Sequence, residues 1–221
     1  MKGMRSDSRS LSTRAKSAVA SANSAALALC LGGALGCEVD DLLDGNAAPP
    51  ASVSGGGIEQ GVFVGVTEAH NTARQELGAS PALGELEWSD ELAVFAQQWS
   101  DDLARRCGTI EHRDQNRFGE NIALRGSTRP DGPFSGAEAV EGWVAEEACW
   151  DYGTIRGSER CDAACIQGLN SSGCGHYTQV VWRGTRFVGC GYSTCQSEGY
   201  TYEVWVCNYD PPGNYIGQTP Y

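Results

Sequence analysis

Two histidines and two glutamates of this chain stand in distinctive local sequence frames. A Gly-Glu-Asn triplet, which contains Glu120, starts seven residues after His112. His176 follows a cysteine and a glycine, and Glu146 lies three residues after Trp143. Neutral imidazoles supply the nitrogen ligands that zinc prefers, whereas carboxylates bind metals, act as general bases or orient imidazoles. These residue types indicate metal binding or acid–base chemistry, provided that the fold brings them together.

Each of these residues also has a plain structural interpretation. His112 has charged neighbours on both sides, which is typical of a solvated loop. Glu120 can simply brace a loop. Glu146 is followed by Glu147, as on a solvated helix face; of these two glutamates, the three-residue step from Trp143 favours Glu146 as the site residue. The chain lacks both the HEXXH spacing of zinc proteases and the GXSXG nucleophile elbow. A metal-dependent hydrolase with Glu120 or Glu146 as general base stays chemically open.

Two segments near the carboxyl terminus are the most distinctive part of the chain. Residues 173–182 read GCGHYTQVVW, and residues 207–221 read CNYDPPGNYIGQTPY. Together with the Gly-Glu-Asn triplet and the Trp-to-Glu step, they resemble the CAP superfamily of secreted cysteine-rich proteins, most closely its plant pathogenesis-related type-one branch. The resemblance covers roughly residues 60–221.

In that family two histidines and two glutamates lie in one surface cleft. The resemblance implies that His112 and His176 bind zinc or another divalent metal and that Glu120 and Glu146 lie beside them. Some relatives carry a serine directly after the first histidine, where this chain has Arg113. This substitution argues against a serine nucleophile, so we expect a binding module rather than an enzyme.

The resemblance implies two other candidate functions. Residues 211–221 match the plan of a defence peptide that plant relatives release, which here requires cleavage between Asp210 and Pro211. A rigid turn followed by a packed tail is the structural alternative. Some relatives carry lipids or sterols, for which the candidates here are Phe187, Val188 and Tyr192; these are also ordinary core residues of a strand.

The chain contains ten cysteines. Without Cys30 and Cys37 of the leader, eight remain, an even number that is typical of four disulfides in an oxidising compartment. No paired CysXaaXaaCys knuckle of a metal cluster occurs. The pairings cannot be chosen from sequence alone. The resemblance implies Cys107–Cys195, Cys190–Cys207 and a bond from Cys174 to a cysteine just upstream, for which Cys165 is the preferred candidate. Cys149 and Cys161 are then left to pair as an addition of this chain, and the pairing among Cys149, Cys161 and Cys165 stays open.

Residues 1–37 have the pattern of a secretory signal peptide, a basic leader before an uncharged stretch rich in Ala, Leu and Gly. The stretch ends in Ala-Leu-Gly-Cys, which resembles a degenerate bacterial lipobox and predicts a lipoprotein that is lipidated at Cys37. An ordinary signal peptide with Cys37 as a free thiol is the alternative. Residues 38–57 are predicted to be a flexible tether and residues 58–221 the CAP domain. We expect an extracellular or cell-surface protein, with an outer-membrane lipoprotein as one form of the latter. It would contact a membrane only through this lipid anchor.

Residues 38–221 contain no lysine, 11 arginines and 27 acidic residues, which leaves a net charge of −16. Such a charge repels nucleic acids and anionic membranes, so we expect neither as a partner. Divalent metals and cationic partners are easier to accommodate. Acidity on its own also keeps a secreted protein soluble.

Apolar spacing predicts three helices. The first carries apolar residues from Phe63 to Leu77 on one face, with His70 among them as a core histidine. The second begins after Ser89, whose hydroxyl is a typical N-terminal cap. The third runs from Ser135 or Gly136 to Ala148.

Strand patterns dominate the end of the chain, at 177–182, 187–192 and 200–207, and predict two antiparallel hairpins. Residues 149–173 are rich in Gly, Ser and Cys and are predicted to form a loop held by disulfides. Helices followed by a late sheet indicate an α+β fold. The resemblance narrows this to a three-layer α-β-α sandwich with a central antiparallel sheet.

Overall fold

A computed structural model of the protein describes residues 53–128, 134–157 and 160–221. The predicted signal peptide, Cys37 and most of the predicted tether lie outside these residues. No helix of the described part is long and apolar enough to cross a membrane. The elements in chain order are η1 (Gly61–Phe63), α1 (Val66–Glu76), β1 (Glu87–Trp88), α2 (Asp90–Arg105), β2 (Gly119–Ser127), α3 (Gly136–Val144), η2 (Ala145–Cys149), α4 (Ala163–Gly168), α5 (Gly175–Val180), β3 (Phe187–Ser197) and β4 (Tyr200–Asp210).

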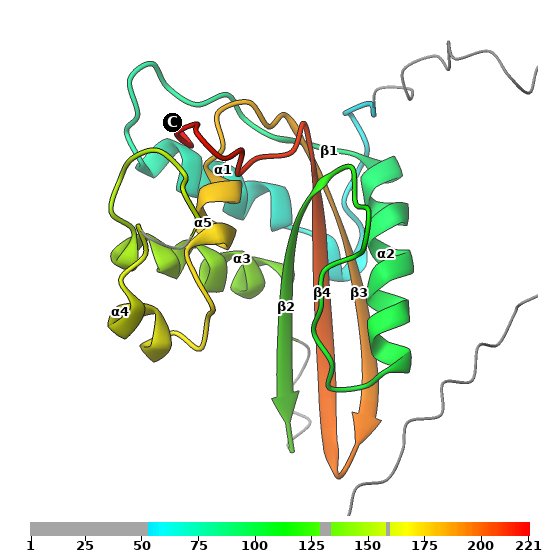
Figure 1. Cartoon of the computed structure of the whole chain (residues 1–221). Coiled ribbons are helices and arrows are strands. Elements are labelled where there is room, and N and C mark those ends of the chain that lie inside the picture. Colours follow the sequence, from blue (N-terminus) through cyan, green and yellow to red (C-terminus); the bar gives the residue numbers. More distant parts are fainter. Residues whose placement is uncertain (1–52, 129–133, 158–159) are drawn as a thin grey trace, which may run out of the picture. The chain divides into compact units, whose positions relative to one another are not determined.

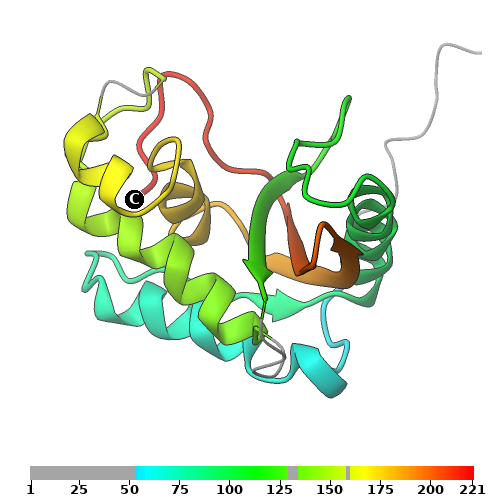
Figure 2. The same ribbon diagram turned by 90° about the horizontal axis from the view of Figure 1, so that it is seen from below.

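The domain has three layers, as predicted. A sheet with strand order β1-β3-β4-β2 lies in the middle, with α2 on one face and α1, α3 and α5 on the other (Figures 1 and 2). β4 pairs antiparallel with both β2 and β3, whereas the short β1 pairs parallel with β3. The predicted α+β sandwich with an antiparallel sheet is therefore confirmed.

Helix α2 lies almost directly on the backbone of β3. A Cβ added at Gly189 would lie 2.3 Å from the backbone nitrogen of Ala93, and one at Gly191 would lie 2.3 Å from that of Gln97. Only glycine permits this approach, so helix and sheet form one rigid layer pair. The predicted start of the helix is confirmed, because the Ser89 hydroxyl accepts a hydrogen bond from the Leu92 amide at 3.4 Å.

The opposite face of the sheet is covered by a core of aromatic and β-branched side chains. Trp205 of β4 is fully buried there, and Phe63 meets its ring edge to face at 5.6 Å. His70 is fully buried, as predicted. Its Nδ1 donates to the carbonyl of Val66 at 2.8 Å and its Nε2 accepts from the Tyr209 hydroxyl at 2.9 Å, so both ring nitrogens are satisfied in the neutral ring.

One predicted strand is wrong. Residues 177–182 form the last turn of α5 and the residues that follow it rather than a strand. Of the two predicted hairpins, only the one between β3 and β4 therefore forms. The backbone amides of His176 and Tyr177 both donate to the Glu146 carboxylate, at 3.0 and 3.1 Å, which requires the first turn of a helix. This contact and the burial of Val180 and neighbouring side chains override the strand propensity of the segment.

Two strands and one helix of the described residues were not predicted. Strands β1 and β2 complete the two edges of the sheet, and α4 lies within the segment that was expected to be a loop. The third predicted helix is divided, because α3 continues into the tighter turns of η2.

All eight cysteines of the described residues form disulfides. Two pairs agree with the resemblance and two do not: the structure contains Cys107–Cys195, Cys190–Cys207, Cys149–Cys165 and Cys161–Cys174. Cys174 does pair with a cysteine just upstream, but this is Cys161 and not Cys165, so the expected pairs Cys165–Cys174 and Cys149–Cys161 are wrong.

The unpredicted helix α4 explains the exchanged pairing. The amide of Asp162 donates to the carbonyl of Cys149 at 2.9 Å, and the Asp162 carboxylate then caps α4 by accepting from the Cys165 amide at 2.7 Å. The turn of α4 brings Cys165 back over η2 to Cys149. Cys161, which precedes the helix, is left beside Cys174.

The disulfide pairing can be checked by peptide mapping. Digestion of the unreduced, denatured protein with endoproteinase Asp-N and chymotrypsin separates the four cysteines of this region onto peptides 144–150, 153–161, 162–169 and 170–177. We expect mass spectrometry to find 144–150 joined to 162–169, and 153–161 joined to 170–177. A link between 144–150 and 153–161 would contradict the structure.

The protein should become less stable as the pH falls below 6.5, because His70 is buried in its neutral form. Burial depresses the pKa of His70 to about 4. Between pH 6.5 and 4 the unfolded chain therefore takes up a proton that the folded chain does not. The free energy of unfolding should lose about 3 kcal/mol over this window and none of it above pH 6.5.

The contribution of His70 is measured by urea unfolding across that pH range in the wild type and in His70→Asn, which keeps a donor for the Val66 carbonyl but does not titrate. Carboxylates common to both proteins cancel in the difference. Parallel pH profiles for the two proteins would show that His70 does not cause the loss of stability at low pH.

Candidate functional site

The four residues singled out by their sequence frames form two histidine–glutamate pairs. His176 of α5 donates from Nδ1 to Oε1 of Glu146 in η2 at 2.6 Å. His112, on the loop before β2, donates from Nδ1 to Oε1 of Glu120 in β2 at 2.8 Å. A carboxylate only accepts, so the proton of each neutral ring lies on Nδ1 and the lone pair on Nε2.

The Glu146 carboxylate is 1% exposed, and both of its oxygens are fully used. Oε1 accepts from His176 and from the Ser171 hydroxyl at 2.6 Å, while Oε2 accepts from the backbone amides of His176 and Tyr177. A negative charge at the first turn of α5 is also favoured by the helix dipole. Glu146 therefore fixes the place and the tautomer of His176.

Trp143 explains the Trp-to-Glu step of the sequence. Its ring stacks on the His176 imidazole with centroids 6.1 Å apart and planes 27° apart. Its Nε1 donates to the carbonyl of Ile122 at 3.4 Å. One turn of chain thus places a ring over the imidazole and a carboxylate at its Nδ1, which leaves His176 22% exposed.

The Glu120 carboxylate is also buried, at 4% exposed. Besides His112, its Oε1 accepts from the Arg113 amide and its Oε2 from the Asn116 side chain, each at 3.0 Å. A Cβ at the preceding Gly119 would lie 2.2 Å from Oε1 of the buried Gln179, so a larger residue there would have to displace that side chain. His112 itself is 64% exposed, and its hydrogen bond to Glu120 raises its pKa above the usual value.

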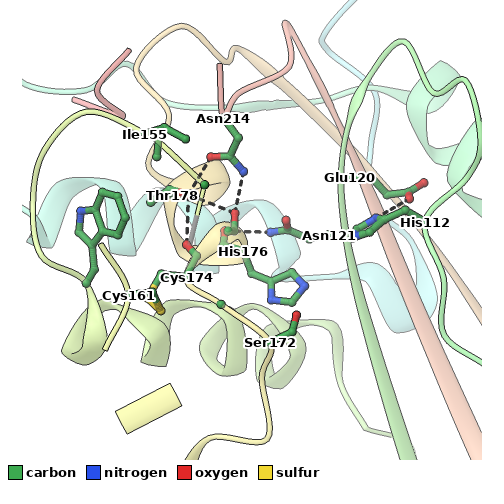
Figure 3. Close-up of a pocket in the computed structure, with 14 residues that line it drawn as sticks. His112, Glu120, Asn121, Ile155, Cys161, Ser172, Cys174, His176, Thr178 and Asn214 are labelled. Atoms are coloured by element: carbon green, nitrogen blue, oxygen red, sulfur yellow. Dashed lines mark hydrogen bonds and ion pairs between the residues drawn. A yellow bond between two sulfur atoms is a disulfide. The ribbon is translucent and has the colours of Figure 1, made fainter. Parts of the chain in front are cut away.

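Both imidazoles line one pocket of about 310 Å³ (Figure 3). Asn121, drawn between them, donates to the His176 carbonyl at 3.1 Å. The far wall comes from the segment that carries α4 and from the carboxyl-terminal tail. The lining residues are His112, Glu120, Asn121, Trp150, Ile155, Gly157, Cys161, Ser172, Gly173, Cys174, Gly175, His176, Thr178 and Asn214.

Sequence analysis missed several members of the site. Ser171 and Asn116 hold the two carboxylates, and Asn214 donates to the Gly175 carbonyl at 2.9 Å in the pocket wall. Asn121 had a signal, because it belongs to the Gly-Glu-Asn triplet. The others come from segments without periodicity, so no local pattern marks them.

The geometry limits how a metal could be held. Within the described residues, no group of three or more His, Cys, Asp or Glu side chains is placed to hold a metal ion. The carboxylates lie behind the imidazoles and are saturated with donors. With each Nδ1 bonded to a carboxylate, Nε2 is the ring nitrogen that His112 and His176 each have left for a ligand, and an imidazole nitrogen is a ligand type that zinc prefers.

Glu146 should be essential to the fold as well as to the site. In Glu146→Gln an amide group replaces an oxygen that accepts from buried donors, so we expect a loss of about 3 kcal/mol in the free energy of unfolding, measured in urea. The neighbouring Glu147 is exposed and accepts from the Tyr177 hydroxyl at 3.2 Å, a bond that the amide oxygen of Gln can also accept, so Glu147→Gln should change the free energy of unfolding by less than about 0.5 kcal/mol. Equal effects of the two changes would contradict the assignment.

Comparison with solved structures agrees with this fold. BmVAL-1 superposes with a TM-score of 0.54 at 20% identity, covering 77% of this chain and 86% of that one. The structure of NaASP2 with Zn²⁺ superposes with a TM-score of 0.51 at 22% identity, covering 79% and 90%. At these identities the likeness concerns the fold alone.

Sequence comparison goes further. The model of the cysteine-rich secretory protein family, CAP, matches residues 67–209. Pathogenesis-related protein 1A of Nicotiana tabacum is 43% identical over 155 residues, 70% of this chain and 77% of the relative. Pathogenesis-related protein 1 of Arabidopsis thaliana is 37% identical over 153 residues, 69% and 78%. The chain therefore belongs to the cysteine-rich secretory protein (CAP) family.

Proposed function

We propose that this protein is an extracellular binding module that holds a divalent metal, best zinc, between His112 and His176, and that it acts in defence or in contact with other cells. One observation carries the proposal. Both imidazoles line the same pocket, and each has its Nδ1 tied to a buried carboxylate, which leaves Nε2 for a ligand.

The carboxylates suit such a role. A carboxylate that accepts from Nδ1 fixes the ring orientation and makes Nε2 a better metal ligand. The net charge of −16 over residues 38–221 favours cations at the surface. NaASP2, a protein with the same fold, has been solved with Zn²⁺. When bound, the metal would offer open positions to a further ligand in the pocket.

An extracellular location is supported by the cysteines and by the leader. All eight cysteines of the described domain are in disulfides, which persist in oxidising compartments. The leader has the signal-peptide pattern, and lipidation at Cys37 would keep the protein at a cell surface. The pathogenesis-related names of the relatives point to defence.

The site favours binding over turnover. Glu120 and Glu146 already accept from several donors, so neither presents a free oxygen as a general base.

The candidate peptide 211–221 is held in the fold, since the Pro220 carbonyl accepts from the Arg183 amide at 2.7 Å. Among the lipid candidates, Val188 is fully buried in the core.

Zinc titration by calorimetry tests the proposal. The oxidised protein should bind one zinc ion per chain. His112→Ala and His176→Ala each remove one of the two protein ligands, so each should weaken binding by more than the roughly 10- to 100-fold that loss of an outer-sphere partner costs. Ser172→Ala, at an exposed serine of the same pocket, is the matched control and should bind as the wild type does.

Two results would overturn the metal proposal. Zinc binding that survives both histidine changes would place the metal elsewhere on the protein. No binding by a folded wild type would leave the pocket for a ligand that needs no metal, and vesicles or sterols would then be the next probes.

A further inference from the structure

The loop that carries His112 is clamped onto helix α2 by the next residue, Arg113. The Arg113 guanidinium lies over the Phe95 ring at 3.8 Å and near the Trp99 ring at 5.4 Å. Its Nη2 also donates to the Phe95 carbonyl at 2.9 Å. The side chain thus has two stacking partners and one hydrogen-bond acceptor, all on α2.

The residue on the other side of His112 is tied to the same helix. Trp99 donates from Nε1 to the carbonyl of Glu111 at 3.0 Å. Trp99 in turn lies under the Arg106 guanidinium at 5.2 Å. Both chain neighbours of His112 are therefore fixed to α2, whose own position is set by its close approach to β3 and by the Cys107–Cys195 disulfide.

His112 has little else to hold it. Its side chain is 64% exposed, and its hydrogen bond within the described residues is the one to Glu120. The backbone amide of Arg113 donates to that same Oε1 at 3.0 Å. A shift of Arg113 would therefore pull on the one acceptor that orients the imidazole.

We propose that Arg113 is a positioning residue, which pins the His112–Glu120 pair against α2 and so fixes the direction in which His112 Nε2 faces the pocket. The role in metal binding rests on the proposed function, whereas the contacts of Arg113 do not depend on a metal. Arginine suits this position because a planar guanidinium can lie over an aromatic ring and donate a hydrogen bond in its own plane at the same time, which an ammonium group cannot do.

Arg117 supplies a matched control. It belongs to the same loop, carries the same charge and lies over the Phe118 ring at 4.5 Å, so Arg117→Ala also removes one guanidinium–ring contact. It differs in that the contact with Glu120 on its side of the loop comes from the Asn116 side chain and reaches Oε2, not the Oε1 that accepts from His112 and from the Arg113 amide. Arg113→Lys is the milder change, since it keeps the charge and loses the planar fork.

The readout is the tautomer of neutral His112, measured by ¹⁵N NMR at a pH above the titration of this residue. The chain has only three histidines, so His112→Ala and His176→Ala suffice to assign the signals. The wild type and Arg117→Ala should carry the proton on Nδ1. Arg113→Ala should give a mixture of tautomers at His112 alone, with His176 unchanged, and Arg113→Lys should shift in the same direction by less. Zinc affinity should fall by about 10-fold in Arg113→Ala and by less than about 2-fold in Arg117→Ala.

The two proposals can fail separately. If zinc does not bind to the wild type, the tautomer still decides the role of Arg113. If zinc binds at the two histidines but Arg113→Ala behaves as Arg117→Ala does in both measurements, the positioning role is overturned while the metal site stands. If Arg113→Ala does not fold, Arg113→Lys decides in the same way: a His112 tautomer unchanged from the wild type overturns the role.

Discussion

A buried carboxylate must find donors for both oxygens, and the site depends on how Glu146 does so. An ionised group out of water is stable only when it is paired and hydrogen-bonded. Its donors come from Ser171 of the segment after α4 and from the first turn of α5, whose amides have no partner within their own helix. Carboxylate and helix therefore satisfy each other. This mutual dependence places α5 against η2, and His176 comes with it.

Local signals located the start of α2 and the last hairpin, whereas the structure of residues 177–182 depends on a distant partner and was predicted wrongly. The Ser89 hydroxyl caps α2 within three residues, and the β3–β4 turn, with positive φ at Glu198 and Gly199, lies between the two predicted strands. Residues 177–182 have the Thr and Val content of a strand, but the need of Glu146 for consecutive amides makes the segment helical. Two of the four expected disulfides failed because their exchange depends on α4, which has no strong sequence pattern.

The candidate site shows the same division. The histidines and glutamates could be found because their frames are local: Trp143 and Glu146, one turn apart, both contact His176. The pocket wall could not be found, because Ile155 and Asn214 are brought together by backbone pairing between the α4 segment and the tail, where the Ile155 amide donates to a tail carbonyl at 2.7 Å. Sequence therefore indicated what the site contains, while only the fold shows how much space a ligand has.

The buried core and the pocket are joined by one chain of hydrogen bonds. Asn121 donates from Nδ2 to the His176 carbonyl and to the Tyr209 hydroxyl, each at 3.1 Å, and Tyr209 donates to His70 Nε2. Burial raises the pKa of Tyr209 well above its usual value, so the hydroxyl keeps its proton. Protonated His70 would donate from both nitrogens and leave the Tyr209 proton without an acceptor. The neutral state of His70 therefore gives the Tyr209 proton its acceptor, while Asn121 links the same hydroxyl to the His176 carbonyl.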